Sequence, residues 1–246
     1  MTLNRSMSIL VHGPSKSGKS TFAATAPGLK LLCDAEAGAR FLDINPIRWD
    51  PASYAPPEPD GTWDTAVVSV RDFNTVVRVL EWLRSGKHPF ESVILDSISE
   101  IQQRLIDGIS NREQMDQRSW GKVLRDFIGT MRDFRDLTDH PTKPLQTVVL
   151  IAMTKQAADG VYKPWLQGQS GVSIPYLFDV CAAMTAPTYS NEDGSIGKLY
   201  RMLIGHNNMY EVGERVGGRL PMYVDSPTVP ELLDWVFGPA AEPAAS

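Results

Sequence analysis

The sequence predicts an α/β fold with a mostly parallel central sheet and helices on both faces. Three observations lead to this prediction. Short apolar strand-like runs alternate with helix-like stretches, a glycine-rich loop stands between the first strand and the first helix, and 246 residues suit one large α/β domain. We therefore expect a single domain over residues 1–238. Residues 239–246 are rich in Pro and Ala, and we expect them to form a flexible tail.

Composition and charge exclude several classes of protein. The chain carries 24 Lys and Arg against 29 Asp and Glu, a formal net charge of −5, so any nucleic-acid binding depends on local placement of cations. No apolar run approaches the ~18 residues of a membrane span, and no secretory signal follows Arg5. Cys33 and Cys181 are isolated thiols, which form neither a zinc pattern nor a disulfide framework. We expect a cytoplasmic protein without membrane contact.

The strongest motif is a complete P-loop. It matches G-x-x-x-x-G-K-[ST] without a mismatch and consists of Gly13, Pro14, Ser15, Lys16, Ser17, Gly18, Lys19, Ser20 and Thr21. An apolar strand is expected at 7–12 and a short helix at 21–26, which is the context that distinguishes the motif from a chance match. Backbone N–H groups wrap the phosphates, Lys19 adds a positive charge, and Ser20 offers a hydroxyl to Mg²⁺. The pattern predicts that ATP and Mg²⁺ are the cofactors.

The remaining elements follow from periodicity and from turn-forming residues. We expect strands at 29–33, 66–70, 92–95, 147–153, 180–185 and 199–204, and helices at 73–83, 100–109 and 120–137. The proline-rich segment 51–61 is expected to be a surface loop. The last strand is expected to turn at residues 206–208 into an antiparallel hairpin.

Two carboxylates follow strands of the expected sheet. Asp96 ends the apolar run Ser92-Val93-Ile94-Leu95, which is the Walker B arrangement for holding Mg²⁺. Because Ser97 and Ser99 precede a helix, helix capping is the alternative role for Asp96. Glu36 follows the strand at 29–33, where a carboxylate can reach a water in line with the γ-phosphate. A solvated loop residue is the alternative for Glu36.

The order of these motifs resembles the RecA core. In that family the strand beside the P-loop also ends in Asp-Ala-Glu, here residues 34–36, and the Walker B strand ends in Asp-Ser, here Asp96 and Ser97. More narrowly, residues 13–21 with 31–38 are similar to the Sak-type single-strand annealing ATPases encoded by phages. The resemblance covers residues 7–221. It implies an ATP-dependent RecA-like fold, single-stranded DNA as a partner, and a homo-oligomer in the form of a ring or filament. It also implies recombination in the host cytoplasm beside a single-strand-binding protein.

The resemblance assigns roles residue by residue. Lys19, Ser20 and Thr21 would bind phosphate and Mg²⁺, Glu36 would be the base that orients water, and Asp96 the Walker B carboxylate. Thr154 and Gln156 would sense the γ-phosphate. RecA proteins show Asn-Gln after this strand, so either Lys155 or Gln156 takes the part of the glutamine. Exposed polarity at the end of a strand is the alternative for all three positions.

A candidate DNA loop follows at residues 157–175. Tyr162 and Trp165 could stack on bases, while Lys155 and Lys163 could neutralise phosphates. In the RecA core the corresponding place is a DNA-contacting loop. The alternative for Trp165 is packing under the loop. Arg112 and Arg118, in a mixed-charge helical region, are weaker DNA candidates.

RecA-like proteins place two basic residues, one apart, in a late strand, and these reach the ATP of a neighbouring subunit. Here Gly213 stands at the first position and Arg215 at the second. Arg215 is therefore the remaining candidate for a residue that reaches the neighbour's ATP, and Arg219 could take its place. The alternative is that Arg215 pairs with Glu214 or Glu211 on the surface. Two other functions stay open: a P-loop kinase of a small substrate, and a nucleotide-gated assembly scaffold with little turnover.

Overall fold

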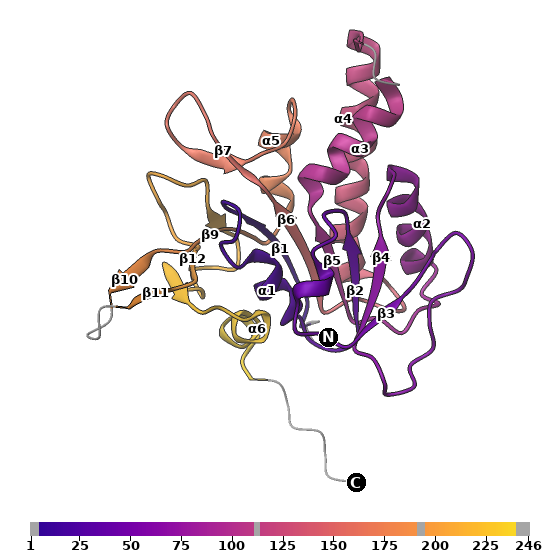
Figure 1. The fold of residues 1–246 in the computed structure, drawn as a ribbon, viewed down its shortest axis with the longest axis horizontal. Helices are drawn as coiled ribbons and strands as arrows, with labels where there is room; N and C mark the ends of the chain where they lie inside the picture. Colours follow the sequence, from indigo (N-terminus) through magenta and orange to yellow (C-terminus); the bar gives the residue numbers. More distant parts are fainter. Residues whose placement is uncertain (1–4, 111–113, 191–194, 240–246) are drawn as a thin grey trace.

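A ten-stranded sheet forms the centre of the protein, which a computed structural model describes for residues 5–110, 114–190 and 195–239 (Figure 1). The strands run in the order β14-β12-β9-β1-β6-β5-β2-β4-β3, and β13 also pairs with β9. Seven strands are parallel: β1 (Met7–His12), β2 (Lys30–Asp34), β3 (Pro46–Arg48), β4 (Thr65–Ser69), β5 (Ser92–Asp96), β6 (Thr147–Ala152) and β9 (Val180–Thr185). Three antiparallel strands complete one edge: β12 (Arg201–Leu203), β13 (Gly213–Glu214) and β14 (Tyr223–Asp225).

Helices cover both faces of this sheet, as the sequence predicted. The helices are α1 (Lys19–Ala24), α2 (Phe73–Arg84), α3 (Ile98–Ser110), α4 (Gln117–Asp136), α5 (Ser170–Ser173) and α6 (Val229–Phe237). Apolar residues of α2, α3 and α4 pack on one face, and those of α1 and α6 pack on the other. Each face of the sheet thus has its own hydrophobic core. Within β1, Leu10 points into the core beneath α2, α3 and α4, whereas Ile9 and Val11 point into the core beneath α1 and α6. Because both faces are covered, β1, β5 and β6 are buried throughout, which explains their unbroken apolar runs.

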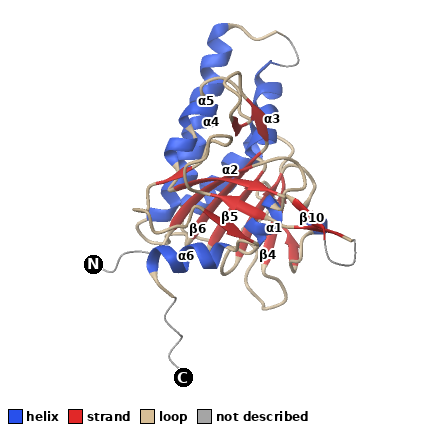
Figure 2. Cartoon of the chain, turned by 90° about the vertical axis from the view of Figure 1, so that its left-hand side faces the viewer, coloured by secondary structure: helices blue, strands red, loops and turns tan. Residues whose placement is uncertain are grey.

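Two hairpins form small two-stranded sheets of their own, outside the central sheet. One is the hairpin of β7 (Thr154–Gln156) and β8 (Tyr162–Pro164), and the other is the hairpin of β10 (Thr188–Ser190) and β11 (Ile196–Lys198). The β7–β8 hairpin and α5 project from the same side of the sheet as the ends of α3 and α4 (Figures 1 and 2). No helix among the described residues is long and apolar enough to cross a membrane.

The structure differs from the sequence prediction mainly near the C-terminus. The antiparallel strands are present, but the turn at residues 206–208 does not join two paired strands, because β12 pairs with β9 and β14 while β13 pairs with the start of β9. Sequence analysis also missed α6, although Thr228 caps it and Pro230 lies in its first turn. Segment 51–61 forms no helix or strand, as expected, and residues 240–246 of the expected tail lie outside the described part of the chain.

The register of the parallel strands creates one functional edge. Asp34 lies opposite Asp96 across β2 and β5, and His12 lies opposite Ala152 across β1 and β6. The loops that follow these four strands therefore start at the same edge of the sheet. In open α/β sheets this carboxyl edge is where ligands bind.

Candidate active site

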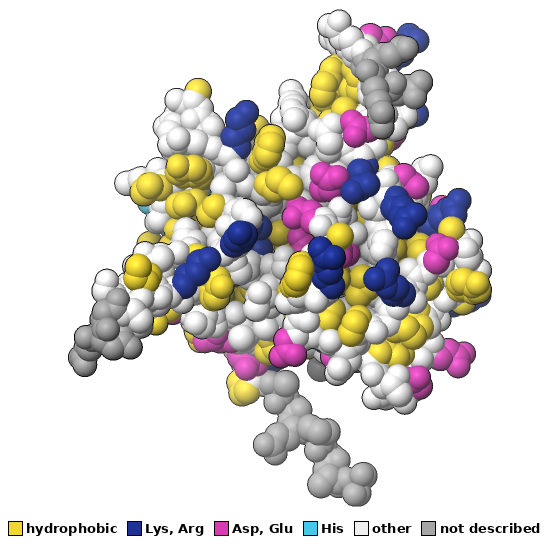
Figure 3. Space-filling model, in the orientation of Figure 1, with side chains coloured by type: hydrophobic (Ala, Val, Ile, Leu, Met, Phe, Trp, Pro, Cys, Tyr) yellow, Lys and Arg dark blue, Asp and Glu magenta, His cyan; other side chains and the backbone are white. Residues whose placement is uncertain are grey.

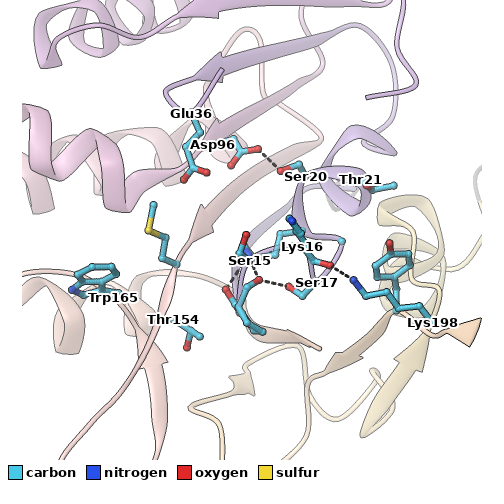
Figure 4. Close-up of a pocket in the computed structure, with 16 residues that line it drawn as sticks. Ser15, Lys16, Ser17, Ser20, Thr21, Glu36, Asp96, Thr154, Trp165 and Lys198 are labelled. Carbon is cyan, nitrogen blue, oxygen red and sulfur yellow. Dashed lines mark hydrogen bonds between the residues drawn. The ribbon is translucent and has the colours of Figure 1, made fainter. Parts of the chain in front are cut away.

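A pocket of about 580 Å³ opens at the carboxyl edge of the sheet (Figure 4). All nine residues of the P-loop line it. The other lining residues lie after β2, at the end of β5, between β6 and β7 and at the start of β7, just after β8, and at or just after the end of β11: Glu36, Asp96, Met153, Thr154, Trp165, Lys198 and Tyr200. The pocket thus collects residues that are far apart in the sequence around one phosphate-binding loop.

Glycines give the P-loop its shape. Gly13 has φ of 155°, and a Cβ built on it would lie 2.2 Å from the carbonyl oxygen of Met184, so no side chain fits there. Gly18 has φ of 89° and stands just before α1, where the left-handed conformation favours glycine. The hydroxyl of Ser17 donates to the carbonyl of Pro14 at 2.9 Å and holds the loop closed. The loop is therefore fixed by its own sequence together with β9.

Lys19 lies at the centre of the pocket. Its Nζ donates to the carbonyl oxygens of Gly13 at 2.9 Å and Pro14 at 2.7 Å. Burial lowers the pKa of Lys19 below its ordinary value, while the nearby carboxylates of Asp96 and Glu36 act to raise it. A cation held between carbonyl oxygens and carboxylates is well placed for the charge of a β- or γ-phosphate.

Ser20 and Asp96 meet directly. The hydroxyl of Ser20 donates to the carboxylate of Asp96 at 2.5 Å (Figure 4). Burial raises the pKa of Asp96 to about 6, with Glu36 and Asp34 adding to the rise and the hydrogen bond from Ser20 opposing it. A buried carboxylate beside a hydroxyl is a donor set that suits Mg²⁺, which takes one or two protein oxygens and keeps waters. These two residues are therefore the ones that would hold the metal.

The alternative role of Asp96 as a helix cap is taken by its neighbour. The side chain of Ser97 accepts a hydrogen bond from the backbone N–H of Glu100 at 3.3 Å, in the first turn of α3. The hydroxyl of Ser97 also donates to a carboxylate oxygen of Glu36. Ser97 thus serves the helix and Glu36, and it leaves the carboxylate of Asp96 directed at Ser20.

Glu36 is held by the residue that begins its own turn. The carboxylate of Asp34 accepts the backbone N–H groups of Glu36 at 3.2 Å, Gly38 at 3.1 Å and Ala39 at 3.0 Å. This turn directs Glu36, which is exposed, into the pocket on the same side as Asp96 (Figure 4). A carboxylate at this position can orient a water towards a bound phosphate.

The three residues considered as γ-phosphate sensors separate in space. Thr154 lines the pocket, whereas Lys155 and Gln156 are exposed on the β7–β8 hairpin and do not. The side-chain amide of Gln156 donates to the carbonyl of Gly160 at 3.0 Å and so closes the hairpin. Of the predicted sensors, the structure brings only Thr154 to the P-loop.

The buried ring of His12 lies between the hydroxyl of Thr154 and the backbone of Glu211. Its Nε2 lies 2.8 Å from the carbonyl oxygen of Glu211, and its Nδ1 lies 3.1 Å from the hydroxyl of Thr154. Burial lowers the pKa of His12 to about 4, so the ring is neutral at physiological pH. A neutral ring that donates from Nε2 to Glu211 accepts at Nδ1, and the single proton of the Thr154 hydroxyl is shared between this nitrogen and the carbonyl oxygen of Lys163, each 3.1 Å away.

The candidate DNA residues divide into two groups. Trp165 lines the nucleotide pocket and is 44% exposed, so it does not pack under the loop. Lys155 is exposed, and it forms no hydrogen bond or ion pair in the described ranges. Tyr162 instead stacks on Tyr210 with ring centroids 5.1 Å apart, and Lys163 pairs with Asp159 at 2.7 Å. Arg118 is exposed at the start of α4, and Arg112 lies outside the described residues.

Arg215 does not reach the P-loop of its own chain. Its guanidinium donates to Asp179 at 2.8 Å and to the carbonyl of Leu177 at 3.1 Å, beside the start of β9. The carboxylate of Glu214 instead accepts backbone N–H groups of its own turn, so the pairing considered from the sequence is wrong in its partner. Arg219 donates to the carbonyl of Val236 at the end of α6.

Sequence analysis missed three pocket residues, Met153, Lys198 and Tyr200, of which the last two come from the far end of the chain. Nζ of Lys198 donates to the carbonyl of Lys16 at 2.8 Å and lies 5.5 Å from the ring centroid of Tyr200 (Figure 4). The same ring lies so close to the P-loop that a Cβ on Gly18 would be 2.7 Å from it. No motif marks Lys198 or Tyr200, because the β10–β11 hairpin brings them to the loop from about 180 positions away.

A comparison with protein families covers the region that contains this site. The family described as the AAA domain matches residues 5–217. No curated protein sequence matches the chain significantly.

Many solved structures are similar to this one, and two of them serve as examples. An ATPase of the type III secretion system of pathogenic bacteria has 13% identity and a TM-score of 0.44, over 73% of this chain and 52% of its own, so the chain spans about half of that protein. A KaiC-like protein from Pyrococcus horikoshii has 16% identity and a TM-score of 0.40, over 80% and 78%. The family match covers most of the chain and includes the whole P-loop, so the protein belongs to the AAA-domain family and is a P-loop ATPase of that family.

Proposed function

We propose that this ATPase binds single-stranded DNA, assembles on it in an ATP-dependent manner and promotes annealing in recombination, as the Sak-type proteins it resembles do. One observation carries the proposal: Trp165, at the base of the β7–β8 hairpin, lines the nucleotide pocket and is 44% exposed. An aromatic side chain that reaches both solvent and the phosphate site can stack on a base and respond to the nucleotide.

The backbone joins this aromatic residue to the pocket. The N–H of Trp165 donates to the carbonyl of Met153 at 2.8 Å, and both residues line the pocket. Met153 is followed at once by Thr154, which bonds to His12 in the strand that leads into the P-loop. A shift of the hairpin on DNA binding would therefore move groups at the γ-phosphate end of the site.

The pocket supplies the groups needed for hydrolysis. Glu36 would orient the attacking water, Lys19 would neutralise the phosphates, and Ser20 with Asp96 would hold Mg²⁺. The metal, when bound, would stabilise charge on the β- and γ-phosphate oxygens. The chain itself places the water and binds the triphosphate.

A homo-oligomer is part of the proposal. Arg215 lies away from the P-loop of its own chain, and its ion pair with Asp179 is half exposed, so the guanidinium is accessible to a neighbouring subunit. A second subunit could therefore receive Arg215 at its γ-phosphate. Whether the assembly is a ring or a filament does not alter the test below.

The test measures ATP hydrolysis and DNA binding in the same preparations. Single-stranded DNA should stimulate the wild-type rate, and Trp165→Ala should lose most of the stimulation while keeping basal hydrolysis. Trp235→Ala is the matched control, because Trp235 is 39% exposed on α6 and lies outside the pocket. Absence of both DNA binding and stimulation in the wild type would contradict the proposal. Phosphate transfer to a small acceptor would instead indicate a P-loop kinase. ATP-dependent assembly without ATP turnover would indicate a nucleotide-gated scaffold.

The two hairpin lysines give a second, internal comparison. Lys163 is paired with Asp159, whereas Lys155 forms no ion pair among the described residues. We expect Lys155→Gln to weaken DNA binding and to flatten its dependence on salt more than Lys163→Gln does. Equal effects, or none, would place the DNA path elsewhere on the surface.

A further inference from the structure

The geometry points to a second phosphate-binding site, separate from the P-loop, in the hollow that Arg48, Arg71 and Arg78 line at the carboxyl ends of β3 and β4. It rests on the proposed function in one respect: we assign its ligand as the phosphodiester backbone of single-stranded DNA. The hollow measures about 610 Å³ and shares no lining residue with the nucleotide pocket.

The three arginines carry the positive charge of the site. All three are exposed, and none of their guanidinium groups donates a hydrogen bond or forms an ion pair within the part of the chain that the structure describes. By contrast, Arg84 and Arg104 nearby are each paired with a carboxylate. Guanidinium groups without partners, gathered on one hollow, suit an anion with several oxygens.

The two acids that line the hollow are already engaged by the chain. The carboxylate of Asp72 accepts the N–H of Thr75 at 2.8 Å and caps α2. The carboxylate of Asp50 accepts from the hydroxyl of Ser53 at 2.7 Å and the N–H of Ala52 at 3.0 Å. These hydrogen bonds lower the pKa of Asp50, and Arg78 adds to the effect. Both acids thus shape the loop and the helix end and have no hydrogen bond from the arginines, so the hollow has three positive charges against two negative ones and its guanidinium groups can turn to a ligand.

One wall of the hollow is aromatic and fixed. Trp49 is buried, and its indole N–H donates to the carbonyl of Tyr54 at 3.1 Å. The N–H of Tyr54 in turn donates to the carbonyl of Asp50 at 3.1 Å. This holds the loop, while the ring of Tyr54 is 73% exposed. An exposed aromatic ring beside unpaired arginines is the combination with which proteins bind single-stranded nucleic acid.

The position of the hollow fits a ligand that also passes the nucleotide site. β3 and β4 are parallel to β2 and β5, so their carboxyl ends lie at the same edge as the P-loop. Lys and Arg side chains gather on this half of the molecule, over β3, β4 and α2 (Figure 3). A chain of phosphates can therefore follow the edge of the sheet without crossing a face covered by helices.

The experiment measures binding of a fluorescent oligothymidylate at several salt concentrations. Arg48→Gln, Arg71→Gln and Arg78→Gln, alone and combined, are compared with Arg132→Gln, an exposed arginine on α4 outside the hollow. Each lost phosphate contact should reduce the log–log salt slope by about 0.7, which weakens binding about fivefold per arginine near 0.1 M salt. The triple variant should lose about 2 from the slope, and Arg132→Gln should lose nothing.

A second arm separates this site from the proposed function. Inorganic tripolyphosphate is titrated by calorimetry into Lys19→Ala protein, in which the P-loop no longer supplies its cation, with and without the three arginine substitutions. If the wild type binds no oligonucleotide but tripolyphosphate binding depends on the arginines, the site stands as one for a small polyphosphate and the DNA function fails. If neither probe depends on the arginines, in variants with unchanged melting temperature, the second site is overturned.

Discussion

Ser20 and Asp96 are 76 positions apart in the sequence, yet the hydroxyl of one donates to the carboxylate of the other at 2.5 Å. The contact exists because β5 lies two strands from β1 in the sheet and its carboxyl end is level with the P-loop. The carboxylate is buried at this point, which raises its pKa to about 6. A cation at this pair would relieve the cost of burying the negative charge.

Glu36 and Asp96 should fail in different ways when each is replaced by its amide. Glu36→Gln keeps the size of the side chain but cannot accept a proton, so hydrolysis should fall by about 10²-fold or more while ATP binding survives. Asp96→Asn should instead raise the Mg²⁺ concentration needed for half-maximal rate. Steady-state rates over a Mg²⁺ titration distinguish the two. Normal turnover by Glu36→Gln would remove Glu36 as the base.

Tyr200 should affect the nucleotide rather than the phosphates alone. Its ring lies against Gly18 and 5.5 Å from Nζ of Lys198, which lies at the other end of the pocket from Glu36 and Asp96 (Figure 4), so we expect it to contact the nucleoside. Tyr200→Ala should weaken ATP binding about tenfold, a loss of about 1.4 kcal/mol, whereas Tyr200→Phe should not. Calorimetry with ATP and with tripolyphosphate checks this. Equal losses for both ligands would show that Tyr200 only supports the loop.

Arg215 should act between subunits. Arg215→Ala is expected to lower turnover and leave ATP binding to the isolated subunit nearly intact, because the guanidinium would stabilise charge only in the transition state. The decisive measurement mixes Arg215→Ala with Glu36→Gln subunits, each inactive alone. A shared site predicts regained activity at interfaces that pair the two intact residues. If co-assembled mixtures stay inactive at every ratio, the ion pair with Asp179 is the whole role of Arg215.

His12 should make the stability of the fold depend on pH. Burial lowers its pKa from 6.5 to about 4, so the unfolded chain binds a proton more readily than the folded one between these values. The contribution of His12 to the free energy of unfolding is therefore fully present above pH 6.5. It falls as the pH drops towards 4, by up to about 1.4 kcal/mol per pH unit. His12→Gln should flatten this dependence in urea denaturation.

His88, whose pKa burial also lowers to about 4, contributes to the same window. The test of His12 is therefore the difference between wild type and variant. A pH dependence of the same slope in both proteins would contradict the assignment.

Local patterns in the sequence are enough to predict the elements whose signals lie within a few residues of one another. The P-loop is one contiguous motif. The backbone angles that the structure shows at Gly13 and Gly18 are ones that glycine adopts readily and other residues rarely do. Apolar runs in the sequence predict the buried parallel strands. A carboxylate that ends such a run, as Asp96 does, lies at the carboxyl edge of the sheet, where ligands bind. The parallel α/β fold and the carboxylates of the pocket could therefore be predicted without coordinates.

Features that depend on which distant segments become neighbours could not be predicted from local patterns. Lys198 and Tyr200 reach the P-loop only because β12 pairs with β9 and carries the preceding hairpin over it. Arg215 faces Asp179 and not its own P-loop, because β13 pairs with the start of β9. The same holds for Tyr162, which stacks on Tyr210 from a segment 48 positions later. Strand pairing is set by burial and hydrogen bonding summed over the whole sheet, and no local pattern encodes that sum.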